Sequence, residues 1–434
     1  MKSFLLAGCA AIALVGTCGT AAADGTGPGK FDVKLSGDAY FTMGYVDQQG
    51  DSANGTTRNV DFTNRFRLQV TPTAKADNGI EYGANLRVRA YERTGVLDTD
   101  QAYLFADGNF GRIEGGVNQG PNNQYGVTAP NGFGTGGVVG DWTDGVYGWL
   151  NNQNTFLEPV FGGGYDNITN SNFATKVNYF TPRFFPQDDD GTGLMGMLAF
   201  TPTNLSVNTD VNRRNYVTTT SSAIEAGGDP TQSECGGTFG NGQPLQGCAY
   251  NNIVEAGLRY DGSFGGVSVQ ASLGYEHGDA PTNHSTRPYT SYNDLSALQA
   301  GIQLGYAGFE IGGSYLNAGK SGYAKTSGLY LNDQSTVTAG ISYQTGPVTV
   351  GFNYAHGEDA GNLYAPGSRS ADLYSLGATY VLAPGLTTSL EYLRSETQNE
   401  AGYGMKGPGT DPFGNGTAYS GNANLFLWKN AIAF

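Results

Sequence analysis

Two short stretches of the sequence set arginines in alternation with apolar residues. TNRFRLQV contains Arg65 and Arg67, and NLRVRAY contains Arg87 and Arg89. Residues two apart point to the same face of an extended chain, so each stretch presents two guanidinium groups on one face and apolar side chains on the other. Guanidinium groups bind carboxylates and phosphates. The four arginines therefore predict a basic surface that acts on charged molecules.

A later segment has the opposite charge. Residues 119–171 carry Asp141, Asp144, Glu158 and Asp166 and contain no lysine or arginine. If this segment lies opposite the arginines, the two groups of charges create a transverse electric field across the gap. In a gap comparable to the Debye length of about 8–10 Å, salt does not fully screen such a field.

Other candidates for catalysis or metal binding are weak. His277 with Asp279, and His356 with Glu358 and Asp359, contain the ligand types of a divalent cation site, but solvated residues at strand ends are the simpler interpretation. The sequence has no G-x-S-x-G motif, and no lysine follows the glycines of GTGGVVG. We therefore expect no enzyme activity, no bound metal and no cofactor.

The composition indicates one large exported all-β unit. The 434 residues include 68 glycines, 27 tyrosines and 22 phenylalanines, and amphipathic helical stretches are missing. Residues 1–23 are predicted to be a signal peptide, with Lys2, an apolar stretch and a small-residue cleavage site at Ala21–Ala23. LAGC, which ends at Cys9, is an alternative cleavage site of the lipoprotein type. The formal charge of −15 argues against a nucleic acid partner.

Two cysteines remain after the signal peptide is removed. Cys235 and Cys248 form an even pair in an exported chain, and we predict a disulfide between them. Metal ligation is the alternative, but no histidine lies nearby in the sequence.

The elements that must position these residues are long strands. In FDVKLSGDAYFTMGYV apolar and polar residues alternate over about fifteen residues, whereas strands of soluble proteins average about five or six. The pattern recurs along residues 24–434. Short turns alternate with long polar connections at roughly 46–58, 119–171, 204–249, 277–293, 317–334, 356–370 and 396–421.

This pattern predicts a transmembrane antiparallel β-barrel. We expect about sixteen strands, with about fourteen or about eighteen as alternatives, short periplasmic turns and long external loops. A soluble β-sandwich would have shorter strands. Tyrosines end many outward-facing rows and predict an aromatic girdle at the external side, formed by Tyr275, Tyr315, Tyr343, Tyr354 and Tyr392.

Several segments together resemble the general porins of Gram-negative bacteria, of the alphaproteobacterial type. They are KLSGDAYFTMGY, AYLFADGNFGRIEGGVNQG, VNYFTPRF and the terminal NLFLWKNAIAF. The resemblance implies a homotrimer of barrels in the outer membrane, surrounded by lipid and lipopolysaccharide. It also implies that the third external loop, 119–171, folds into the lumen as a constriction.

The C-terminus resembles the signal by which the barrel assembly machinery recognises its substrates. Phe434 is the last residue, and Ile432, Trp428 and Phe426 alternate back from it. Asn430 departs from the hydrophobic alternation of that signal.

In such a barrel the four arginines face the lumen, because Phe66, Leu68, Leu86 and Val88 occupy the lipid-facing positions. The opposite orientation would cost about 2–4 kcal/mol for each arginine near the bilayer midplane. The arginines and the acidic loop then form a charged eyelet. In the alternatives, the arginines pair with lumenal acids such as Glu81 and Glu114, or bind lipopolysaccharide near the rim.

The sequence therefore predicts passive diffusion of small hydrophilic solutes and ions. A substrate-specific channel, for example for sugars, would need an aromatic ladder along the lumen. The lumen-facing positions are mostly Ser, Thr, Asn, Gln and charged residues, although Tyr40 and Tyr91 are among them. A non-transporting barrel, either an adhesin or an outer-membrane enzyme, is the third alternative. We expect weak selectivity that favours cations slightly.

Overall fold

The computed structural model describes residues 31–48, 59–90, 97–140, 168, 171–186, 192–204, 250–280, 293–321, 332–361, 366–400 and 419–434. The predicted signal peptide, the four predicted acidic residues and both cysteines lie outside these ranges.

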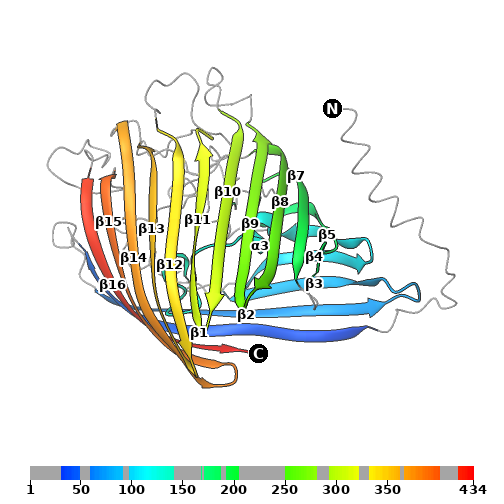
Figure 1. Ribbon diagram of the computed structural model, residues 1–434, viewed down its shortest axis with the longest axis horizontal. Coiled ribbons are helices and arrows are strands. Elements are labelled where there is room, and N and C mark those ends of the chain that lie inside the picture. The colour runs from blue at the N-terminus through cyan, green and yellow to red at the C-terminus, as the bar shows by residue number, and fades with distance from the viewer. Residues whose placement is uncertain are drawn as a thin grey trace. The chain divides into compact units, whose positions relative to one another are not determined.

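Within the described residues, sixteen antiparallel strands form one closed barrel (Figure 1). Each strand lies beside its neighbours in the sequence, and β1 pairs with β16 to close the ring. The strands are β1 (Asp32–Gln48), β2 (Val60–Lys75), β3 (Glu81–Ala90), β4 (Leu97–Gly108), β5 (Gly111–Asn118), β6 (Ala174–Phe180), β7 (Gly193–Thr203), β8 (Asn251–Phe264), β9 (Val267–Asp279), β10 (Leu295–Tyr306), β11 (Phe309–Gly319), β12 (Gln334–Thr345), β13 (Val348–Gly361), β14 (Pro366–Ala383), β15 (Leu386–Glu400) and β16 (Tyr419–Ala433). The predicted barrel of sixteen strands is confirmed.

Helical structure in the described part of the chain is confined to the connection after β5. It consists of α3 (Pro121–Tyr125) and a short 3-10 helix, η1 (Gly137–Val139). No helix in the described residues is long and apolar enough to cross a membrane.

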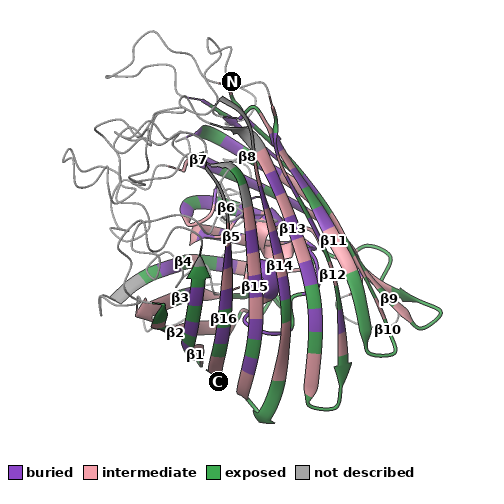
Figure 2. Cartoon of the chain, turned by 90° about the vertical axis from the view of Figure 1, so that its left-hand side faces the viewer, coloured by how far each residue is buried: buried purple, intermediate pink, exposed green. Residues whose placement is uncertain are grey.

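Burial alternates along the strands as the sequence pattern predicts (Figure 2). On β1, Phe41 and Met43 are exposed on the outer face, whereas Tyr40 and Thr42 are buried on the inner face. Large apolar side chains that face outward, away from the rest of the chain, are what a barrel surface in contact with hydrocarbon requires.

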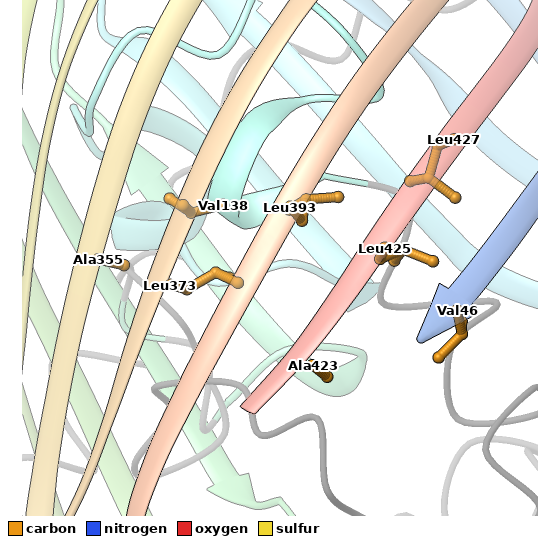
Figure 3. Close-up of a cluster of buried hydrophobic side chains, with 8 residues drawn as sticks. All are labelled: Val46, Val138, Ala355, Leu373, Leu393, Ala423, Leu425 and Leu427. Atoms are coloured by element: carbon orange, nitrogen blue, oxygen red, sulfur yellow. The ribbon is translucent and has the colours of Figure 1, made fainter. Parts of the chain in front are cut away.

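The external ends of β13 to β16 depart from the prediction. These strands extend into the segments 356–370 and 396–421, which we expected to be loops. Their inner face here is apolar: Leu373, Leu393 and Leu425 are fully buried and pack with Val138 of η1 (Figure 3).

The outer face at this level carries polar side chains instead. His356 lies beside Asp372 on the neighbouring strand, and Arg394 pairs with Glu396 on β15. Because charged groups facing hydrocarbon are costly, this level of the wall lies beyond the hydrocarbon layer. The inner face is apolar at this level because a protein segment packs against it there.

One residue of the predicted external tyrosine girdle lies at the other rim of the barrel. Tyr343 lies two residues before the end of β12, at the short-turn side, where its ring centroid is 4.3 Å from that of Phe309 at the start of β11. Tyr354 lies near the middle of β13, where its ring centroid is 5.1 Å from that of Tyr374. Tyr343 is therefore part of the aromatic residues at the short-turn rim.

The C-terminal residue contributes directly to closure of the barrel. Phe434 and Gly37 exchange two backbone hydrogen bonds of 2.8 and 3.0 Å, and the Phe434 ring lies 6.2 Å from the ring of Phe66. A Cβ atom at Gly37 would lie 2.8 Å from this ring, so glycine is required for the close approach.

We predict that deleting Phe434 lowers the amount of folded barrel in the outer membrane. The deletion removes both hydrogen bonds and the aromatic contact, together roughly 2–4 kcal/mol. The measurement is the level of heat-modifiable protein in outer-membrane fractions. Phe434→Tyr, which keeps the backbone and the ring, is the matched control and should behave as the parent. Parental levels in the deletion variant would contradict the prediction.

Candidate functional site

The four predicted arginines form one patch on the inner wall, here called the basic wall. Arg65 and Arg67 are on β2, Arg87 and Arg89 are on β3, and Arg67 lies directly across from Arg89. Outward-facing side chains such as Phe66 alternate with them and are exposed. The structure therefore brings the four guanidinium groups together on the lumenal face.

Two aspartates hold this basic wall in place. Asp38 of β1 lies 2.6 Å from Nε of Arg67 and 3.4 Å from Nη2 of Arg65. Asp100 of β4 accepts two hydrogen bonds from Arg87, at 2.6 and 2.7 Å. It also lies 4.0 Å from Nη1 of Arg89. Taken together, these four arginines and two aspartates carry a formal charge of two positive units.

These partners differ from the acids that the sequence suggested. Glu114 pairs with Arg112 at 2.7 Å, and Glu81 lies across from Lys75, near the short turn between β2 and β3. Asp38 precedes the region of the arginines by one strand. The sequence does indicate that Asp38 faces inward, because it lies two residues from Tyr40 on β1. Its pairing with Arg65 and Arg67 depends on the register between β1 and β2.

The described residues 119–140 of the connection after β5 fold into the lumen, as expected for the third external loop. The backbone N–H groups of Val127, Ala129 and Val138 donate to side chains of β9, β12 and β13, which are Ser272 at 2.8 Å, Thr338 at 3.3 Å and Asn353 at 3.0 Å. These acceptors all lie on the inward face of their strands. We name residues 119–140 the inner loop; it contains no charged residue.

Small residues of the wall allow the inner loop to lie close. The ring of Phe133 occupies the space where Gly351 and Gly377 have no side chain, and a Cβ at either position would meet it. Beside it, Thr135 donates from its backbone N–H and its hydroxyl group to the buried carboxylate of Glu391. This contact fixes the far end of the inner loop to β15.

Two buried charges hold the other end. Lys176 of β6 donates to the carbonyl oxygen of Asn118 at 2.8 Å and to that of Ser171. Glu255 of β8 accepts from the hydroxyl group of Ser171 and from the side-chain amide of Asn122 at 3.1 Å. Asn118 and Ser171 flank the loop excursion, so Lys176 and Glu255, here called the neck clamp, tie its two stems together.

The helix α3 docks beside the neck clamp. The Asn122 amide sits against Gly257 and Gly274, where a Cβ atom would collide with it. The Tyr125 ring packs on Phe180 with centroids 5.2 Å apart in an edge-on arrangement. Burial, followed by the charge of a nearby glutamate, raises the pKa of the Tyr125 phenol, so it stays protonated and neutral at physiological pH.

Two residues of the histidine clusters have polar partners on other segments of the chain. The ring Nδ1 of His356 lies 2.8 Å from Oδ1 of Asp372, on the neighbouring strand. Asp279 accepts a hydrogen bond from Asn252 at 2.8 Å. Among the described residues, no group of three or more potential ligands is arranged to hold a metal ion.

The family model described as Gram-negative porin matches residues 10–400 of this chain. The chain belongs to this family. The porin is also 35% identical over 85 residues to a porin of Rhodobacter capsulatus; the match spans 20% of this chain and 24% of that relative's length.

Solved structures agree on the fold. An anion-selective porin from Comamonas acidovorans superposes with a TM-score of 0.53 at 13% identity, covering 93% of this porin and all of that chain, 100%. The outer membrane channel DcaP of Acinetobacter baumannii gives 0.51 at 13% identity, with coverage of 93% and 97%. A trimer form of OmpT from Vibrio cholerae gives 0.52 at 12% identity, with coverage of 94% and 100%. This porin is an outer-membrane β-barrel.

Proposed function

We propose that this porin forms a water-filled channel for passive diffusion of small hydrophilic solutes and ions across the outer membrane. The observation that carries the proposal is the lining of the lumen. The barrel is closed, the basic wall lies on β2 and β3, and the inner loop is hydrogen-bonded to strands from β9 to β15. The loop narrows the passage from one side. The basic wall lines the other.

The rest of the third loop completes the eyelet in this proposal. Asp141, Asp144, Glu158 and Asp166 follow the inner loop and are the proposed acidic side. They supply carboxylates that the uncharged inner loop lacks. A transverse field between them and the arginines orients polar solutes and disfavours apolar ones, which lose hydration without aligning a dipole.

The proposed assembly is a homotrimer in lipid and lipopolysaccharide, delivered by the barrel assembly machinery. Support for the trimer comes from family membership and from the trimeric form of the Vibrio cholerae protein of the same fold. The chain needs no cofactor for this function, and we infer that it has no enzyme activity.

Liposome swelling tests general diffusion against the alternatives. Proteoliposomes should swell in sugars and amino acids at rates that fall smoothly with solute size. A single sugar that enters far faster than others of its size would instead indicate a substrate-specific channel. Proteoliposomes that do not swell in any solute would indicate a non-transporting barrel.

A further inference from the structure

Another cation faces the lumen at the seam where the barrel closes. Lys429 on β16 follows Trp428, which is exposed on the outer face, so Lys429 lies on the inner face. It lies across from Thr42 of β1 on one side and from Ser389 of β15 on the other.

Lys429 is linked to the basic wall through one aromatic ring. The ammonium nitrogen of Lys429 lies 4.7 Å from the ring centroid of Tyr40, and Cζ of Arg65 lies 4.7 Å from the same centroid. The Tyr40 ring is 5% exposed, and a cation near an aromatic face is held more firmly when the pair is shielded from water. Tyr40 therefore positions a cation from each neighbouring strand.

Lys429 also lies near the anchored end of the inner loop. Glu391, which accepts the two hydrogen bonds from Thr135, is two residues from Ser389, the cross-strand partner of Lys429. Diagonal neighbours of this kind are within reach of long side chains. Lys429 thus stands between the basic wall and the inner loop.

We propose that Lys429 is a specificity-determining residue of the ion pathway, positioned by Tyr40. Together with Arg65 it forms a contact for small permeating anions such as halide, carboxylate and phosphate. The inference rests on the proposed channel function. Lys429 places a further cation beside Arg65 of the basic wall, on the side where the buried carboxylate of Glu391 holds the inner loop.

Cysteine substitution with charged thiol reagents tests this role. Coulomb's law gives roughly a two-fold change in local ion concentration for one unit charge about 8 Å away in water. Because the same charge attracts anions and repels cations, Lys429→Cys should lower the anion-to-cation permeability ratio about four-fold. A positively charged methanethiosulfonate should restore the ratio in this variant, and a negatively charged one should lower it further. The parent protein, treated with both reagents, is the control.

Tyr40 variants test the positioning role separately. Tyr40→Phe keeps the ring and should keep the parental permeability ratio. Tyr40→Leu removes the ring and should change the ratio in the same direction as Lys429→Cys, with heat-modifiable protein at parental levels. Equal ratios in the Leu and Phe variants would overturn the positioning role.

The outcomes separate this inference from the channel function. If the parent conducts but Lys429→Cys has the parental ratio and neither reagent alters it, Lys429 does not contact the ion pathway and the inference is wrong. If the parent carries no current, the proposed channel function itself fails.

Discussion

Replacing Arg65, Arg67, Arg87 and Arg89 together by glutamine should make the channel strongly cation-selective. The change leaves Asp38 and Asp100 without their guanidinium partners, so the formal charge of the patch changes from two positive to two negative units. If each unit charge alters local ion concentration about two-fold, four units change the permeability ratio roughly ten-fold or more. The measurement is the reversal potential under a potassium chloride gradient.

The matched control is the quadruple Arg→Lys variant. Lysine keeps the charge but not the bidentate geometry, so the sign of the native selectivity should be preserved even if its size changes. Identical reversal potentials for the native and Arg→Gln channels would mean that the basic wall does not line the constriction.

A substitution in the neck clamp should have the second large effect, which is on the stability of the open channel. Lys176→Met removes the cation and leaves Glu255 buried, with Glu276 buried directly across from it on β9. Leaving a buried charge without a compensating opposite charge nearby costs about 3–5 kcal/mol. We expect the stems of the inner loop to separate, with frequent current fluctuations and closure at lower voltage in single-channel recordings.

A double variant distinguishes charge from packing. Lys176→Met combined with Glu255→Gln removes both charges and keeps an amide that Ser171 and Asn122 can still bond. We expect the frequency of current fluctuations in this variant to be close to that of the parent. If the Lys176→Met channel fluctuates no more often than the parent, the neck clamp does not hold the inner loop.

The sequence alone predicted which side chains of the strands face the lumen. A period of two is a local property, so the alternation around Arg65 and Arg87 was enough to direct all four arginines into the lumen. The partners depend on register between strands. Arg67 pairs with Asp38, which is 29 residues away, and the Asn122 amide bonds Glu255 across 133 residues. No local pattern carries that information.

The external ends of β13 to β16 show where the parity rule itself fails. The rule assigns apolar residues to lipid and polar residues to the lumen, but Leu373, Leu393 and Leu425 face inward. They pack with Val138, which belongs to a distant segment of the chain. The alternation along these strands does not contain the fact that the inner loop covers this surface, so it does not give the inward orientation of these three leucines.

Single-channel recording in planar bilayers tests the central claim most directly. The purified native porin should insert with large, ohmic conductance steps that an excess of sugar does not block. Conductance that falls on addition of one sugar would contradict general diffusion, and insertion without measurable current would contradict a channel of any kind.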